Sequence, residues 1–164
     1  MIILIIISAI IIYLIVDSIK VVAPEENYVV ERNGTYYKTW KDGVHIKIPI
    51  IDRVVNITTT KEMVKNSSPQ PVITKDNIAL GIRTVVSYQI IDPKLYTYGV
   101  ENPPGAIDLL IITSLRKLIV KLEWSEVLAT IGEINAEIHA ILDEVTAQWG
   151  IKVNSFEIAS FKQH

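Results

Sequence analysis

The sequence contains no cysteine, which excludes disulfide cross-links, thiolate metal ligands and cysteine nucleophiles. It also lacks a basic stripe, because its 16 Lys and Arg residues are interspersed with 18 Asp and Glu residues. Surfaces that bind nucleic acid concentrate positive charge, so we expect no nucleic-acid partner. The 164 residues suffice for one domain of ordinary size with a hydrophobic core.

Motifs that carry catalysis are also missing. The chain has no G-x-S-x-G, P-loop or G-x-G-x-x-G pattern. Its three histidines, His45, His139 and His164, share no metal-ligand spacing with a carboxylate or with one another. We therefore expect no catalytic residue, no metal and no cofactor. A triad assembled from distant residues stays open as an alternative, but no residue pattern nominates one.

One long hydrophobic run opens the chain, and only Ser8 and Tyr13 interrupt it before Asp17. A helix over Ile2 to Val16 would be about 23 Å long, and continuing it through Val22 gives about 32 Å, near the thickness of a bilayer core. The alternatives are a buried core helix or a cleaved signal peptide, but no basic region precedes the run. We expect a membrane anchor over residues 1–22. Its apolar residues are Ile2, Ile3, Leu4, Ile5, Ile6, Ile7, Ile10, Ile11, Ile12, Tyr13, Leu14, Ile15 and Val16.

The flanking charges favour one orientation. No Lys or Arg precedes the run, whereas Lys20 follows it, offset by Asp17. The positive-inside rule then leans towards a single-pass or monotopic membrane protein with most of its chain in the cytoplasm.

Residues 23–164 read as strands followed by helices and a last strand, an order that favours an α+β domain. Asn33-Gly34 suits a type I′ hairpin turn between the two strands that flank it. Val44, Ile46 and Ile48 alternate with polar residues, which predicts a strand with these three facing the core and His45 facing outward. The expected strands are Tyr28–Arg32, Thr35–Trp40, a strand around Val44–Ile48, Arg53–Thr60, Ile78–Ile90 and Ile151–Ile158.

The stretch QPVITKDN, residues 70–77, precedes the longest of these strands. Its proline bars helix, its β-branched residues favour a pleated surface, and Asp76-Asn77 favour a turn. We interpret it as architecture that sets the register of the Ile78–Ile90 strand. In the last strand the apolar residues change from odd positions, Ile151 and Val153, to even positions, Phe156 and Ile158. This change predicts a bulge around Asn154-Ser155.

Two helices of ordinary length are expected, one over Ala106–Leu122 and one ended by Gly150, with a short helix capped by Ser125 between them. The first has a second apolar set besides its core stripe. An apolar belt this wide predicts burial on two sides, the outer one by a neighbouring copy. The expected oligomer interface is Leu109, Ile112, Ile119 and Val120.

A short apolar turn carries a second open question. Ile48, Pro49, Ile50 and Ile51 place three bulky apolar side chains around a proline. They read either as the core-packed end of a strand or as a loop that contacts lipid beside the anchor.

Several motifs in register resemble the SPFH or Band 7 superfamily of stomatin, prohibitin, flotillin and HflK-HflC, most closely its stomatin-like branch. V-x-E-R-x-G-x-Y begins at Val29, and G-x-H-x-x-x-P-x-x-D-R-V begins at Gly43. QPVITKDN, residues 70–77, closely resembles the sequence that is usual at this position in that branch. Further matches are Asp92-Pro93, Tyr98 to Glu101, Leu115-Arg116 and Trp149 to Val153.

The resemblance covers nearly the whole chain and implies an N-terminal membrane helix followed by an SPFH domain of antiparallel strands with packed helices over 23–164. Relatives continue into a charged coiled coil, which is absent here because the chain stops at His164. The implied function is a non-enzymatic scaffold that forms homo-oligomers on the bilayer and organises microdomains. Implied partners are channels or membrane proteases of the FtsH type or associated with NfeD. The alternatives are a membrane-tethered hydrolase and a dedicated regulatory subunit of a membrane protease.

Overall fold

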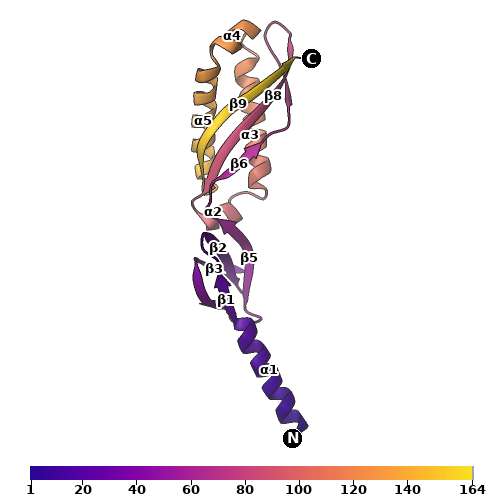
Figure 1. Ribbon diagram of the computed structural model, residues 1–164, viewed down its shortest axis with the longest axis vertical. Coiled ribbons are helices and arrows are strands. Elements are labelled where there is room, and N and C mark those ends of the chain that lie inside the picture. The colour runs from indigo at the N-terminus through magenta and orange to yellow at the C-terminus, as the bar shows by residue number, and fades with distance from the viewer. Residues whose placement is uncertain (164) are drawn as a thin grey trace. The chain divides into compact units, whose positions relative to one another are not determined.

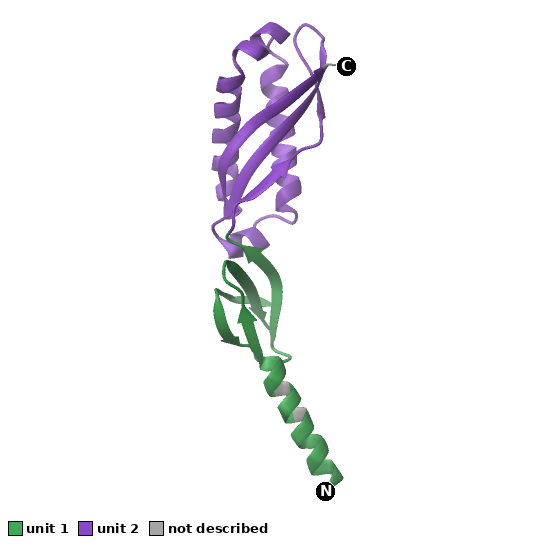
Figure 2. Cartoon of the chain, in the orientation of Figure 1, with its two compact units in different colours: residues 1–60 green, residues 61–164 purple. Residues whose placement is uncertain are grey.

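The computed structural model describes residues 1–163, except for the side chains of residues 10, 14 and 163. The chain divides into two compact units, Met1–Thr60 and Lys61–His164 (Figure 2). Wherever two strands pair in the described residues, they run antiparallel. The α+β class with antiparallel sheets is therefore confirmed.

The first unit consists of one helix and five strands (Figure 1). Helix α1 is followed by a three-stranded sheet of order β3-β2-β5 and by a ribbon in which β1 pairs with β4. A small core of Val22, Val30 and Trp40 lies between them. The elements are α1 (Ile2–Ser18), β1 (Ile19–Val22), β2 (Glu26–Arg32), β3 (Thr35–Trp40), β4 (Gly43–Ile46) and β5 (Asp52–Thr59).

The expected membrane-spanning helix is wrong. Helix α1 ends at Ser18 after 17 residues, which is about 26 Å of helix and less than the roughly 30 Å of a bilayer core. Among the described residues, no helix combines the length and the hydrophobicity needed to cross a bilayer. The expected continuation to Val22 fails because the chain turns into β1, where Ile19 pairs with Ile46, and the Lys47 N–H donates to the Ser18 carbonyl at 2.7 Å.

The second unit is built around β8, which corresponds to the expected Ile78–Ile90 strand. Strands β6 and β7 pair with one edge of β8, and β9 pairs with the other. The predicted bulge is confirmed, because the β8–β9 register shifts where Ser155 and Val153 face Ser87 and Tyr88. The strands are β6 (Met63–Asn66), β7 (Gln70–Ile73), β8 (Ala79–Ile90) and β9 (Ile151–Gln163).

Helices α3 and α5 supply the other half of this core (Figure 1). Their buried stripes, centred on Leu115 and Ile138, pack with Leu80, Ile82 and Val86 of β8. Burying an aliphatic side chain of this size contributes about 1.5–3 kcal/mol, so this core is the main source of stability of the unit. The helices are α2 (Pro93–Tyr98), α3 (Pro103–Ile119), α4 (Trp124–Ala129) and α5 (Ile131–Ala147).

Gly150 joins the end of α5 to the end of β8. Its φ of +69° is left-handed, and its carbonyl accepts hydrogen bonds from the N–H groups of Ile91 and Asp92 at 2.8 and 3.0 Å. A Cβ at this position would meet the Asp92 carbonyl and the Leu95 side chain. The expected C-terminal glycine of the helix therefore also serves a close approach of two backbones.

We expect Gly150→Ala to lower the free energy of unfolding of the second unit by more than about 1 kcal/mol, through backbone strain and the clash with Asp92. Urea unfolding followed by circular dichroism measures it. Gly132→Ala is the matched control, because a methyl group there meets open space, and should be neutral or stabilising by up to about 1 kcal/mol. Equal stability of the two variants would contradict this account of Gly150.

Candidate apolar contact surface

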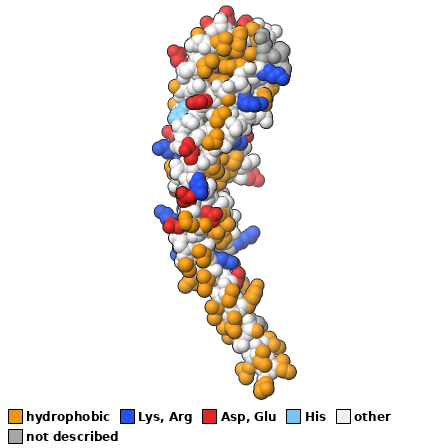
Figure 3. Space-filling view, in the orientation of Figure 1, with side chains coloured by type: hydrophobic (Ala, Val, Ile, Leu, Met, Phe, Trp, Pro, Cys, Tyr) orange, Lys and Arg blue, Asp and Glu red, His pale blue; other side chains and the backbone are white. Residues whose placement is uncertain are grey.

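Helix α1 exposes apolar side chains on all of its described sides. Ile5, Ile12, Tyr13 and Val16 are each more than half exposed, and hydrophobic side chains cover this helix in Figure 3. The expected anchor residues Ile10 and Leu14 have side chains outside the described set. A helix that is apolar all round is stable only when lipid or protein covers it.

The β1–β4 ribbon continues the apolar surface beyond α1. The register pairs Ile19 with Ile46 and Val21 with Val44, so these four side chains share one face of the ribbon. That face is open, since Val44 is 69% and Ile46 is 75% exposed. We call these four residues the ladder.

The ladder reverses the expected orientation of β4. His45, expected to face outward, is only partly exposed and stacks on Trp40 with ring centroids 5.3 Å apart. Its Nε2 lies 2.7 Å from the Lys41 carbonyl oxygen. Because successive side chains of a strand alternate, the inward His45 turns Val44 and Ile46 outward. The expectation that they face the core is wrong.

The turn between β4 and β5 extends the same open apolar character. Ile48, Ile50 and Ile51 are exposed, and Ile50 reaches 97% at a left-handed φ of +76°. Pro49 is partly exposed between them. The placement favours the interpretation as a contact loop over that as a core-packed strand end, while contact with lipid itself stays a prediction.

A buried carboxylate holds this turn in place. Asp52 accepts hydrogen bonds from Arg32 Nε at 2.7 Å and Nη2 at 3.1 Å, and from the Ile48 N–H at 2.9 Å. The Arg32 guanidinium also lies 3.8 Å from the centroid of the Tyr37 ring. The hydrogen bond from Arg32 holds the pKa of Asp52 below its usual range, against the opposing effect of burial. The turn is therefore tied to the end of the β2–β3 hairpin.

The expected oligomer interface is only partly on one surface of α3. Leu109 and Val120 are exposed and Ile112 is half-buried, whereas Ile119 is fully buried in the core of the second unit. The first three residues can meet a partner without unfolding of the unit, and Ile119 cannot. Whether a second copy covers them stays a prediction.

The described residues bring together no chemistry-bearing cluster. Within residues 1–163, no group of three His, Cys, Asp or Glu side chains could hold a metal ion. His139 lies half-buried on α5, and the expectation about His164 falls outside the described residues.

Sequence reasoning missed the ladder, because β1 was assigned to the membrane helix. The pairing of two short apolar stretches, residues 19–22 and 43–46, was the signal that could have revealed it.

Fold and surface together define a class: a small α+β protein whose prominent exposed feature is an apolar surface. Comparison with known proteins then identifies the family. A sequence model of the SPFH domain / Band 7 family matches residues 20–162, and the chain belongs to this family. The membership supports a scaffold-type role.

Relatives come from bacteria, archaea and animals. An uncharacterized protein of Methanothermobacter thermautotrophicus is 36% identical over 93% of this chain and 48% of its own length. An uncharacterized protein of Mycobacterium tuberculosis is 34% identical over 91% of this chain and 39% of its own length. Human stomatin-like protein 2, mitochondrial, is 34% identical over 84% of this chain and 38% of its own length. The chain thus spans less than half the length of these relatives.

The Asp52–Arg32 pair makes the first unit sensitive to acid. Because the folded-state pKa of Asp52 lies below the ordinary value of about 3.9, its stabilisation is present above that pH and is lost as pH falls through the folded-state pKa. We expect Asp52→Asn to lower the melting temperature of this unit at pH 7, and the difference from wild type to shrink near pH 3.

Thermal unfolding reported by an amide resonance of β2 checks this expectation. The control is Asp42→Asn, which removes one exposed carboxylate from the same unit. If the gap between wild type and Asp52→Asn persists unchanged at pH 3, the pair does not act through the charge of Asp52.

Proposed function

We propose that the chain is a scaffold subunit that associates with a bilayer through the apolar surface of its first unit, as a monotopic protein. One observation carries the proposal: α1, the ladder and the Ile48–Ile51 turn expose apolar side chains in one unit, and no described residue covers them. Exposed apolar patches of this extent mark contact with lipid or protein. Family membership and similarity to stomatin-like protein 2 add support.

The energetic argument favours lipid for α1. The helix carries no charged residue before Asp17, so any side of it can enter hydrocarbon. The four ladder residues are 53% to 75% exposed, and their side chains add about 4–8 kcal/mol if lipid covers them, before ordering costs. For lipidated proteins, a single acyl chain gives only marginal membrane binding, and a second membrane contact makes the attachment stable. We apply the same reasoning to α1, which would be strengthened by a second apolar contact. The ladder and the turn supply that second contact.

Ion pairs at the junction fit an interfacial position. Lys20 and Lys47 lie 3.5 and 3.6 Å from the Asp17 carboxylate, where α1 gives way to β1. Paired charges at this point mark where the chain leaves the apolar environment.

The second unit supplies self-association in this proposal. The exposed Leu109 and Val120 and the half-buried Ile112 form an apolar strip on α3 that a second copy would cover. An array of such subunits would organise a membrane microdomain and regulate membrane proteins within it, such as proteases or channels. Co-purification of one protease with the chain would favour a dedicated regulatory subunit instead.

Because the chain has no cysteine, a single labelled cysteine reports the lipid contact without interference. An environment-sensitive dye on Ile50→Cys should show a blue-shifted, brighter emission when phosphatidylcholine vesicles are added. The same dye on Asp42→Cys, an exposed polar turn position of the same unit, should not respond. A chain that remains unbound in vesicle flotation, or equal emission from both sites, would overturn the membrane-contact proposal.

A second experiment addresses self-association. Leu109→Glu with Ile112→Glu should lower the molar mass measured by light scattering, because charges would face the neighbouring copy. The matched control is Ala136→Glu, which adds a charge at an exposed position of α5. Circular dichroism must show folded protein in both cases. An unchanged mass in the double variant would remove α3 from the interface.

A further inference from the structure

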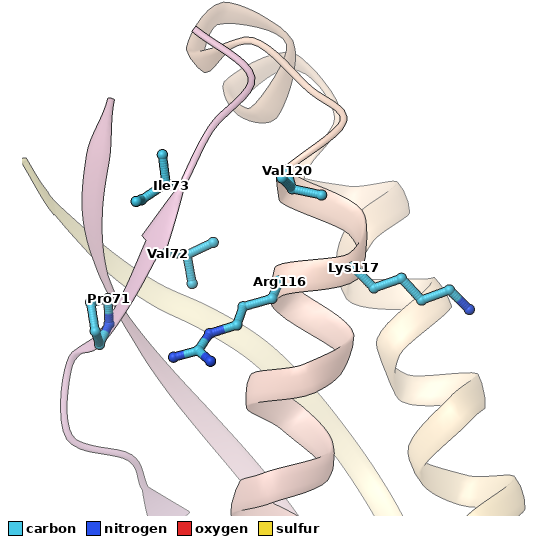
Figure 4. A pocket seen from close by; sticks show the side chains of 6 residues that line it. All are labelled: Pro71, Val72, Ile73, Arg116, Lys117 and Val120. Carbon is cyan, nitrogen blue, oxygen red and sulfur yellow. The ribbon is translucent and has the colours of Figure 1, made fainter. Parts of the chain in front are cut away.

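A groove of about 620 Å³ lies between β7 and α3 in the second unit, and its lining shares only Val120 with the apolar strip on α3. Pro71, Val72 and Ile73 line it from β7, and Arg116, Lys117 and Val120 line it from α3 (Figure 4). Its volume is in the range of ligand-binding sites. The lining is mostly apolar, with cationic side chains on one side only.

The outer edge of β7 is open along this groove. Thr74 N–H donates to the Ile78 carbonyl at 3.0 Å, while the Ile78 N–H donates to Thr74 Oγ1 at 3.1 Å, so Thr74 and Ile78 occupy a hydrogen-bonding position of the antiparallel pairing. Such pairs alternate with pairs that make no hydrogen bond, and the register opposes Ile73 to Ala79. The N–H and C=O of Ile73 therefore point away from β8. In the described residues, neither group has a partner.

Proline fits this parity. Pro71 shares the outward register of Ile73, so its missing N–H costs β8 no hydrogen bond. The same proline blunts the edge against indiscriminate strand pairing. An occupant must therefore be selected by side chains as well as by backbone.

The side chains around Ile73 specify what the occupant carries. Ile73 is 55% exposed and points away from α3, so it offers apolar area to a bulky side chain on the outer face of β7 (Figure 4). Arg116 extends from α3 towards Pro71, whereas Lys117 extends away from β7 (Figure 4). No described carboxylate pairs with Arg116. A guanidinium beside an apolar groove favours a carboxylate, which it can bind through two parallel hydrogen bonds.

We propose that this groove binds an extended, acidic segment of a partner protein that alternates carboxylate and bulky apolar side chains. The segment adds to the edge of β7, and its backbone pairs with the N–H and C=O of Ile73. One apolar side chain rests on Ile73, on the face of β7 away from α3, and the next residue of the segment places a carboxylate beside Arg116 on the α3 side. Main-chain pairing supplies affinity and the two side-chain contacts supply specificity, as in other cases of strand addition.

The test uses the full chain in nonionic detergent and a short fluorescein-labelled peptide that alternates valine and glutamate. Fluorescence anisotropy should show saturable binding, weakened about tenfold or more by Arg116→Glu through loss of the charged hydrogen bonds. Lys117→Glu makes the same change in net charge on the outward side of the helix and should weaken binding less than about threefold. Thermal unfolding establishes that both variants are folded.

Two further peptides separate the elements of the proposal. A valine–lysine peptide should not bind, and a valine–glutamate peptide with alternate amides N-methylated should lose binding because it cannot pair with Ile73. Equal losses in the two protein variants would reduce the site to general charge attraction and overturn the proposal. It is also overturned if anionic vesicles displace the peptide, or if no peptide binds and Arg116→Glu instead lowers the molar mass by light scattering. The last result would make the groove an interface between copies.

Discussion

The apolar turn of the first unit depends on one ion pair, that of the buried Asp52 carboxylate with Arg32. Asp52 accepts bonds from the guanidinium and from the Ile48 N–H, while Asn33 N–H donates to the Ile51 carbonyl at 3.2 Å. These bonds close both ends of the turn. They hold Ile50 in a left-handed conformation that a β-branched residue adopts only at a cost, which the surrounding structure must overcome.

In β4 and the turn after it, a histidine and the Asp52 carboxylate face inward, and aliphatic side chains face outward. The Asp52 side chain has no exposed area, and His45 stacks on Trp40, whereas Ile50 and the ladder face outward. In water alone this distribution is unfavourable, because apolar area gains most from being covered. It becomes favourable when lipid or protein covers the outer face. The buried polar contacts then fix the orientation of the apolar ones, since an inward His45 forces its strand neighbours outward.

Sequence patterns predicted the second unit better than the first, for a physical reason. The expected strand Ile78–Ile90 matches β8 closely, because its apolar residues alternate and a helix-packed core buries one face of the sheet. In β4 the alternation of apolar and polar residues was predicted correctly, but the face predicted to be buried was wrong. The His45 ring stacks on the buried Trp40, so the polar face of the strand points inward. The run before Asp17 has no periodicity at all, so it could not indicate that α1 ends at Ser18. On α3 the apolar belt was broad, and only packing separates the buried Ile119 from the exposed Val120.

The stretch QPVITKDN shows how a short polar tie can also shape the second unit. Asp76 bonds the Thr74 hydroxyl and accepts the Trp124 N–H at 3.3 Å, and Lys75 N–H donates to the Leu122 carbonyl at 2.9 Å. These contacts fasten the turn after β7 to the start of α4 and cover the strand edge at Lys75. The cover stops there, so the edge opens at Ile73, beside Arg116. The residues that make QPVITKDN an identifier of its relatives thus also determine where the edge of the sheet is closed and where it stays open to a partner.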